Sequence, residues 1–422
     1  MVSLGEVLGV AGRRGLWTAP GLACAPVLCF FLVLGPSSLV AGFSTGLGSD
    51  RPGDISLKST TLVVEVGSWD VATDNQGQMV TVYSHGSEIY FARISSQLQV
   101  HSPVRVCSSD DQVTSISIMQ DSDQAYRLAY ATYRLIRAPE ACLNIFTSFS
   151  IDGGRTWSAP RLALGGNRTS EGQNMYFDLC LAEDAHGVFW MFWNFAARYK
   201  DGLSGKFTTS IDRGVTWSPA QTMFHMEGDT PIPARFEGLT TDSCRQLHLI
   251  YTSDIFDSRG DIWYQVRLAQ SQNWSQAERI VPYIEVTSAT VYSQSTNQAW
   301  EDRLWVLWHD VGYKSDRYVL GYSDNSGEAW QTYGYIDRDI IGSYHVLERP
   351  RPKLASMETD SSQETGLYIF WQEQDSVQSS PIGKVIEGSE EIPETALTTI
   401  VFLLLLAASL TICRERFQPS PR

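Results

Sequence analysis

Short apolar runs separated by polar turns recur along most of the chain, and this pattern predicts β-strands rather than helices. Each unit begins with an apolar strand, an acidic or polar turn, and a second strand rich in aromatic residues. These strand pairs occupy residues 71–82, 179–192, 239–250 and 354–370. Third strands are expected at residues 89–93, 206–210, 261–265 and 318–322, and fourth strands at 160–164 and 277–281. The repeating unit is therefore a four-stranded antiparallel sheet of about 50 residues.

An eight-residue pattern, S-x-D-x-G-x-T-W, follows the third strand in several units. Two copies are intact, a third has asparagine in place of the aspartate, and residues 270–275 look like a degenerate copy. The residues that carry the pattern are Ser150, Asp152, Gly154, Thr156, Trp157, Ser210, Asp212, Gly214, Thr216, Trp217, Ser323, Asn325, Gly327 and Trp330. In such a turn the aspartate accepts backbone hydrogen bonds, glycine allows a positive φ, and tryptophan packs between neighbouring sheets. We therefore interpret these residues as structural rather than catalytic.

The spacing of the units predicts an all-β, six-bladed β-propeller over residues 58–388. The blades are expected to begin near residues 68, 113, 176, 236, 287 and 350. Radial repetition of this kind protects sheet edges between neighbouring blades. The last unit has no obvious outer strand, and residues 60–66 are able to supply it and so close the ring. Five or seven blades are the alternatives.

Composition narrows the class of partner. The chain is 43% apolar and 19% charged, which is sufficient for a packed core and excludes a disordered chain. Its formal net charge of -15 repels phosphate backbones, so nucleic acid is excluded as a partner.

The cysteines and two asparagines of the predicted propeller are candidates for disulfide bonds and N-glycosylation, which occur in exported proteins. Four of the seven cysteines lie in the predicted propeller. They are Cys107, Cys142, Cys180 and Cys244. An exported domain permits two disulfides among them, with three pairings, and free thiols are the alternative. No zinc spacing or metal-binding histidine pattern occurs, so we expect no metal and no cofactor. Asn167 and Asn273 each open an N-x-S/T tripeptide and are candidate glycosylation sites.

Both ends of the chain indicate export and membrane attachment. Arg13 and Arg14 precede a short apolar run and small residues, so residues 1–42 read as a signal peptide, with an uncleaved anchor as the alternative. Residues 396–412 carry no charge, and Arg414 and Arg416 follow. They predict one membrane-spanning helix with residues 413–422 inside, the propeller outside and residues 389–395 as the juxtamembrane linker. Residues 392–396 also resemble a bacterial cell-wall sorting signal, although Ile392 and Ala396 depart from the LPxTG pattern.

The box turns and four-stranded units resemble those of the sialidase (neuraminidase) superfamily over residues 58–388. The resemblance implies the propeller fold, whereas activity does not follow from it because non-enzymatic propellers carry the same turns. A sialidase of this family clamps the substrate carboxylate with three arginines. It uses a tyrosine nucleophile activated by a glutamate, and an aspartate as acid and base.

Several of these family positions differ in this sequence. Residues 68–70 (SWD) stand where an Arg-Ile-Pro motif opens the first blade, and no Arg-Ile-Pro occurs anywhere. Glu237 matches the family glutamate, but residues 251–253 (YTS) replace the next clamp arginine. Residues 349–351 (RPR) take the place of the tyrosine, with Tyr344 upstream. These departures argue against ordinary sialidase catalysis.

Inner strands begin beside the axial channel, where propellers bind ligands, so residues near these starts are the candidates for a site. Candidate catalytic residues are Glu237, Asp70 and Asp178, and candidate ligand-binding residues are Arg235, Arg349, Glu348 and Tyr344. Carboxylates beside arginines suit sugar hydroxyls, an amine or a cation. Two carboxylates are also the minimum equipment of a glycoside hydrolase. Solvated or mutually paired side chains around a water-filled channel are the alternative.

Three functions are consistent with these features. The first hypothesis is a membrane-anchored extracytoplasmic propeller that recognises a glycan or protein ligand without sialidase turnover. The alternative is a glycoside hydrolase of exo-sialidase type that uses carboxylates at the channel mouth. A purely structural envelope protein is the third.

Overall fold

A computed structural model describes residues 53–54, 60–64, 66–137, 140–169, 175–196, 203–227, 230–253, 261–271, 273–281, 286–294, 302–310, 317–337, 352–358, 365–373 and 376–384. The predicted signal peptide, juxtamembrane linker, membrane span and tail lie outside these ranges, and so do Tyr344, Glu348 and Arg349. Within the described ranges, no helix has the length and apolar character that a membrane span requires.

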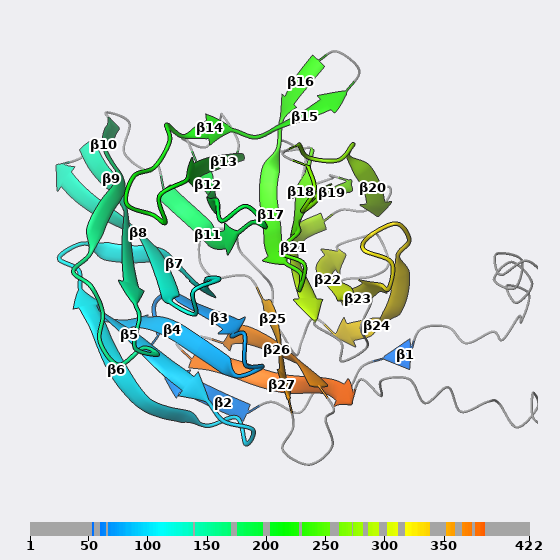
Figure 1. Ribbon diagram of the computed structural model, residues 1–422, viewed down its shortest axis with the longest axis horizontal. Helices are drawn as coiled ribbons and strands as arrows, with labels where there is room; N and C mark the ends of the chain where they lie inside the picture. The colour runs from blue at the N-terminus through cyan, green and yellow to red at the C-terminus, as the bar shows by residue number, and fades with distance from the viewer. Residues whose placement is uncertain are drawn as a thin grey trace, which may run out of the picture. The chain divides into compact units, whose positions relative to one another are not determined.

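Six antiparallel sheets, each built from four successive or ring-closing strands, form the blades of a propeller (Figure 1). The inner strands are β3 (Trp69–Thr73), β7 (Gln112–Gln120), β11 (Met175–Glu183), β17 (Arg235–Thr241), β21 (Val286–Gln294) and β25 (Lys353–Glu358). They open blades 1 to 6 in that order. The second strands are β4 (Met79–His85), β8 (Tyr126–Arg137), β12 (Phe189–Ala196), β18 (Leu247–Thr252), β22 (Arg303–Asp310) and β26 (Thr365–Glu373). The six-bladed, four-stranded architecture predicted from the repeats is therefore confirmed.

Third and outer strands complete each blade. The third strands are β5 (Glu88–Ile94), β9 (Glu140–Ser150), β13 (Leu203–Ser210), β19 (Ile262–Arg267), β23 (Arg317–Ser323) and β27 (Ser376–Lys384). The outer strands are β6 (Val100–Ser108), β10 (Arg161–Thr169), β14 (Gln221–Thr222), β20 (Glu278–Val281), β24 (Gln331–Asp337) and, in blade 6, β2 (Thr60–Val64). Antiparallel pairing of β2 with β27 joins the two ends of the ring, as the apolar run at residues 60–66 predicts.

Two further elements were not predicted. The short strand β1 (Gly53–Asp54) adds in parallel to the outer edge of blade 5. The hairpin of β15 (Phe224–Glu227) and β16 (Thr230–Pro233) lies between blades 3 and 4 in the sequence and pairs only with itself among the described strands. Neither has the length or periodicity that marks the blade strands.

The inner strands surround an axis. They contact one another in the order β3, β7, β11, β17, β21, β25 and back to β3. Hydrogen bonds from Leu179 to Ser115 and from Leu181 to Ser117 advance in step along β11 and β7, so these neighbours run parallel. We call the end where the inner strands begin the entry face and the end where they finish the turn face.

Each interface between blades has its own apolar core. Six clusters of buried residues lie between consecutive sheets, one at each interface of the ring. Trp69 of blade 1 and Phe370 of blade 6 belong to one of them, so the closing interface also has an apolar core. Because each sheet buries both faces, its central strands read as nearly continuous apolar runs.

The box turns connect third strands to outer strands and rest on the preceding blade. In blade 2, Asp152 accepts hydrogen bonds from the backbone N–H of Arg155 and Thr156, and Trp157 packs on Phe91 of blade 1. Gly154 has φ +86°, and a Cβ there would lie 2.2 Å from the Phe91 ring. Only glycine satisfies both constraints.

The same contacts recur in the other boxes. Trp330 of blade 5 packs edge-on against Tyr264 of blade 4, although asparagine replaces aspartate in that turn. Trp274, in the degenerate copy, packs edge-on against Trp190 and Phe192 of blade 3. The tryptophan contact therefore survives where the rest of the pattern is lost.

Candidate functional site

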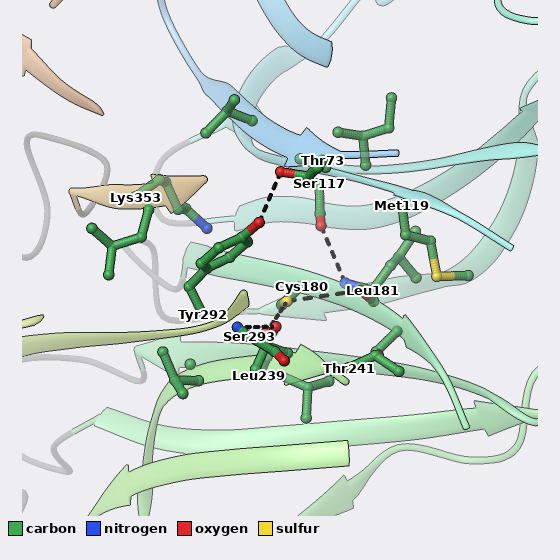
Figure 2. A pocket seen from close by; sticks show the side chains of 18 of the residues that line it. Thr73, Ser117, Met119, Cys180, Leu181, Leu239, Thr241, Tyr292, Ser293 and Lys353 are labelled. Carbon is green, nitrogen blue, oxygen red and sulfur yellow. Dashed lines mark hydrogen bonds between the residues drawn. The ribbon is translucent and has the colours of Figure 1, made fainter. Parts of the chain in front are cut away.

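An axial cavity of about 590 Å³ lies between the inner strands and is lined by residues from all six of them (Figure 2). Of the predicted residues, Asp70, Asp178 and Glu237 line it, on the side of the entry face. Arg235 does not line it, and Arg349, Glu348 and Tyr344 lie outside the described residues.

Asp70 and Lys353 form an ion pair across the closing interface. The Lys353 Nζ lies 3.3 Å from Oδ1 of Asp70, while Oδ2 of Asp70 accepts a hydrogen bond of 3.0 Å from the backbone N–H of Ile118. Burial alone would lower the pKa of Lys353, but the charges of Asp70 and Asp178 outweigh it and hold that pKa above its usual value. The amine is therefore cationic at neutral pH and already faces two carboxylates.

Glu237 is enclosed within the protein. Its side chain has 0% exposure, and Oε2 accepts a hydrogen bond of 3.0 Å from the backbone N–H of Ala289 on the next inner strand. Oε1 accepts one of 3.1 Å from the Thr252 hydroxyl and another from Nε of Arg235. The guanidinium that the sequence assigned to ligand binding is thus held by the predicted catalytic glutamate.

Asp178 has an unusual backbone. Its φ is +55°, and it lies where the register of β11 against β12 shifts between Phe177 and Cys180. This left-handed conformation is uncommon for a non-glycine residue and turns the half-buried side chain towards the cavity. Its Oδ2 accepts a hydrogen bond of 3.1 Å from the Asn194 amide.

Short polar side chains join neighbouring inner strands where no backbone ladder connects them. Ser115 accepts from the Leu179 N–H at 2.8 Å, and Thr240 accepts from the Ser293 N–H at 3.1 Å. Asp70 and Glu237 make the same kind of contact to the following blade. Both carboxylates therefore accept hydrogen bonds from backbone N–H groups of neighbouring inner strands, which would otherwise lack partners beside the channel.

Hydroxyl groups line the middle of the cavity. Figure 2 shows Tyr292 reaching across to Thr73, with the two hydroxyl oxygens 2.9 Å apart. The Tyr292 oxygen also accepts a hydrogen bond of 3.0 Å from the Ser356 N–H. Cys180, beside Lys353 in the lining, donates its thiol to the Leu239 carbonyl at 3.5 Å. The wall is suited to groups that exchange hydrogen bonds with hydroxyls.

Aspartates end or follow inner strands on the turn face, and two of them, Asp74 and Asp242, line the cavity there. The residues that end or follow the inner strands of blades 1 to 4 are Asp74, Asp121, Asp184 and Asp242, and each accepts hydrogen bonds from backbone amides of its own turn. Glu183 accepts a hydrogen bond of 2.6 Å from the Ser122 N–H of blade 2 and also contacts Arg245 of blade 4. These groups hold three adjacent turns together.

The lining is strongly acidic. Among the described residues it contains seven carboxylate side chains and two basic ones, Lys353 on the entry side and Arg245 on the turn side. No described arginine reaches the entry side of the cavity, so the three-arginine clamp of sialidases is not rebuilt in that part of the chain.

Sequence reasoning missed several lining residues, among them Lys353 and Tyr292 and the turn-face groups Asp74, Asp242 and Arg245. The sixth inner strand was placed to begin near residue 350, whereas β25 begins at Lys353. The expected and observed starts differ by three residues, and Lys353 is the basic group that the described residues place on the entry side of the cavity. Alternation in the sequence locates a strand but does not fix its first residue to this accuracy.

The structure also locates the four propeller cysteines and the two candidate glycosylation asparagines. Cys107, Cys142, Cys180 and Cys244 are free thiols, so neither of the two permitted disulfides forms. In the described part of the chain, no group of three or more His, Cys, Asp or Glu side chains is arranged to hold a metal ion. Asn273 is exposed, and Asn167 lies in β10.

Comparison of the sequence with protein families gave no match, and neither did comparison with curated proteins. The structure is similar to a protein of unknown function from Dyadobacter fermentans, with a TM-score of 0.55, 10% identity and coverage of 78% of this chain and 99% of the other. It is also similar to an α-L-arabinanase from Penicillium chrysogenum complexed with arabinobiose, with a TM-score of 0.51, 12% identity and the same coverage. A Hadza microbial sialidase aligns with a TM-score of 0.48 and 13% identity over 75% of this chain and 65% of that one.

At these low sequence identities, the similarity is evidence for a shared fold alone. Six closed four-stranded blades give this chain a β-propeller fold, which the similarity to these solved structures supports.

Proposed function

We propose that the chain is a membrane-anchored extracytoplasmic propeller that recognises a glycan or protein ligand in its axial cavity without ordinary sialidase turnover. One observation carries the proposal. Glu237, the residue that matches the sialidase glutamate, is fully buried and accepts hydrogen bonds from Ala289, Thr252 and Arg235. A base committed in this way is poorly placed to activate a nucleophile, because it would first have to break its contacts.

The negative charge of the cavity lining favours ligands that carry no carboxylate. A sialoside carries a carboxylate, and an acidic lining with its entry-side lysine already paired with Asp70 repels such a group. Hydroxyl-rich neutral sugars, or groups with an amine, match the carboxylates and hydroxyls of the wall. We therefore expect a neutral or amino-bearing glycan, or a peptide with a basic side chain.

Membrane anchorage rests on the sequence. The apolar segment at residues 396–412 and the arginines after it support a single span with the propeller outside. The leader-like residues 1–42 support export by the same route.

A glycoside hydrolase is the second candidate, and one observation favours it. Asp70, Asp178 and Glu237 all line the same cavity, and Asp178 has a left-handed backbone, a strained conformation that is enriched at active sites. The arabinanase that shares this fold was solved with arabinobiose, so arabino-oligosaccharides belong among the test substrates.

Hydrolysis assays on the full-length protein separate the two. Purified chain is incubated with a fluorogenic sialoside and with arabino-oligosaccharides, and product release is compared with that of the Glu237→Gln and Asp178→Asn variants. Glu88→Gln, which removes an exposed pair with Arg105, is the matched control. The proposal predicts no release above buffer for any of these proteins. Release that Glu237→Gln or Asp178→Asn abolishes and Glu88→Gln preserves would establish the hydrolase instead.

A further inference from the structure

Exposed apolar side chains concentrate in the box turns. Ile211 is 86% exposed, Ile151 79%, Val215 59% and Leu268 46%. All four belong to turns between third and outer strands, which are otherwise polar. Leu162, 57% exposed, begins the outer strand directly after the box of blade 2. Large aliphatic groups gathered in this way indicate a surface that something covers.

These turns lie on one end of the propeller. In blade 2, Gln120 at the end of the inner strand pairs with Tyr126, which pairs with Ser150 at the start of the box. The box is therefore on the turn face, and the other boxes take the same place in their blades. Ile151, Ile211 and Leu268 belong to blades 2, 3 and 4, which are consecutive, so the apolar groups occupy one side of the turn face.

The described chain also leaves the propeller on the turn face. Glu358 pairs with Thr365, and Gly366 pairs with Lys384, so Lys384 lies at the end of blade 6 where the inner strand finishes. The sequence then continues for eleven residues, 385–395, before the apolar segment 396–412 begins. Eleven residues span at most about 40 Å when fully extended. An anchor on this connection keeps the point where the described chain leaves the turn face within about 40 Å of the bilayer.

We infer that the turn face of blades 2 to 4 lies against the surface of a lipid bilayer and inserts Ile151, Ile211, Val215 and Leu268 into its interface. The entry mouth of the cavity, with Asp70 and Lys353, then points away from the membrane. This inference rests on the membrane anchorage in the proposed function.

The chemistry of the face selects zwitterionic lipid. Arg155 and Arg213 lie in the same turns as the exposed isoleucines, and the half-exposed carboxylate of Asp123 in blade 2 pairs with Arg213. Because this face carries both positive and negative side chains and the chain has a net charge of -15, it is not attracted to anionic headgroups. Insertion of apolar side chains therefore holds the turn face on the bilayer. Blades 2 to 4 and the anchor at blade 6 then hold the propeller at opposite sides.

Site-specific fluorescence quenching tests the orientation. The full chain, with Cys244 and the three cysteines outside the propeller (Cys24, Cys29 and Cys413) replaced by serine, is reconstituted in phosphatidylcholine nanodiscs. A single cysteine is introduced as Ile151→Cys or Ile211→Cys on the turn face, or as the exposed Ser87→Cys control at the entry face, and is labelled with an environment-sensitive dye. Quenching by brominated lipid and by a water-soluble quencher is measured for each.

Brominated lipid is expected to quench the turn-face labels at least about two-fold more than the Ser87→Cys label, since interfacial groups lie within the upper acyl region. The water-soluble quencher should give the reverse order. Equal lipid quenching at all three sites overturns the inference, and shielding of the turn face from both quenchers assigns it to a protein partner or a second copy instead. Loss of the chain from the nanodiscs refutes the anchorage itself, which separates failure of the proposed function from failure of the orientation.

Discussion

Replacement of Glu237 tests whether the residue is structural or functional. Glu237→Gln keeps the shape of the side chain but leaves one oxygen to accept what two oxygens accept now. The bonds at stake come from the Ala289 N–H, the Thr252 hydroxyl and the Arg235 guanidinium. The new amide N–H₂ must face at least one of these donors, so the site loses both a charge and its hydrogen-bond match.

The structure sets the size of the effect. The Arg235 side chain is only 10% exposed, so removal of its partner leaves a nearly buried guanidinium without its carboxylate. Breaking a buried pair costs about 3–5 kcal/mol. Glu88→Gln removes an exposed pair with Arg105 and should cost less than about 1 kcal/mol.

Urea unfolding, followed by tryptophan fluorescence, measures both variants against the parent protein. We expect the midpoint of Glu237→Gln to fall clearly below that of Glu88→Gln, with little change in the slope of the transition. If Glu237→Gln unfolds with the control while losing ligand binding or hydrolysis, the structural reasoning is wrong and the glutamate belongs to the active machinery.

Three further predictions concern the box turns and the thiols. Gly154→Ala should destabilise the protein by about 2–4 kcal/mol, because its Cβ meets the Phe91 ring and its φ is positive; urea midpoints measure this. Hydrogen bonds, chiefly from Thr156 of its own turn, lower the pKa of Asp152 to about 2. The contribution of its ionised carboxylate to the free energy of unfolding is therefore complete above pH 4 and is lost as the pH falls through 2. A carboxyl ¹³C titration measures this pKa. Burial raises the pKa of Cys180 to about 11, so at pH 8 a thiol reagent followed by mass spectrometry should modify exposed Cys244 first.

Each of these has a clear contrary result. Gly86 also has a positive φ, but a Cβ there meets nothing within 4 Å, so Gly86→Ala should cost less than Gly154→Ala. Equal losses would mean that the contact with Phe91 is unimportant. An Asp152 titration midpoint near 4 would mean that the turn is open in solution. Modification of Cys180 as fast as Cys244 would mean that the cavity wall opens readily.

The fold could be predicted because local chemistry repeats. The boxes of blades 2, 3 and 5 each combine a positive-φ glycine with a tryptophan that packs on a neighbouring sheet, and the degenerate box of blade 4 keeps the tryptophan. The closing strand was also visible, since residues 60–66 form an apolar run outside the sixth unit. Repeated local signals of this kind fix blade number and closure without any knowledge of distant contacts.

The candidate site could be predicted only in part. Asp70, Asp178 and Glu237 line the cavity as expected of residues near inner-strand starts, yet their partners come from other blades. The bond from Ala289 to Glu237 joins residues 52 positions apart, and the pair of Asp70 with Lys353 spans the closing interface. Such partners depend on strand register and on ring closure, which a single sequence leaves undetermined.

Arg235 illustrates the same limit at short range. Arg235 and Glu237 are two positions apart in β17, with one residue between them, so alternation places both side chains on one face of the strand. Alternation does not show that the guanidinium bonds to Glu237 rather than to a ligand; in the structure Nε of Arg235 donates to Oε1 of Glu237, beside the register shift between Phe236 and Gly238. No local pattern in the sequence marked that shift.

Ligand binding by the full-length protein and its Lys353→Met variant tests the central claim, that an acidic axial cavity recognises neutral or amino-bearing ligands, most directly. A glycan array is probed with both proteins at pH 7, where the raised pKa keeps Lys353 cationic. The account predicts that the parent protein binds neutral or amino sugars and not sialylated ones, and that Lys353→Met changes the affinity for those same sugars. Selective binding of sialylated glycans, or a profile that Lys353→Met leaves untouched, would contradict it.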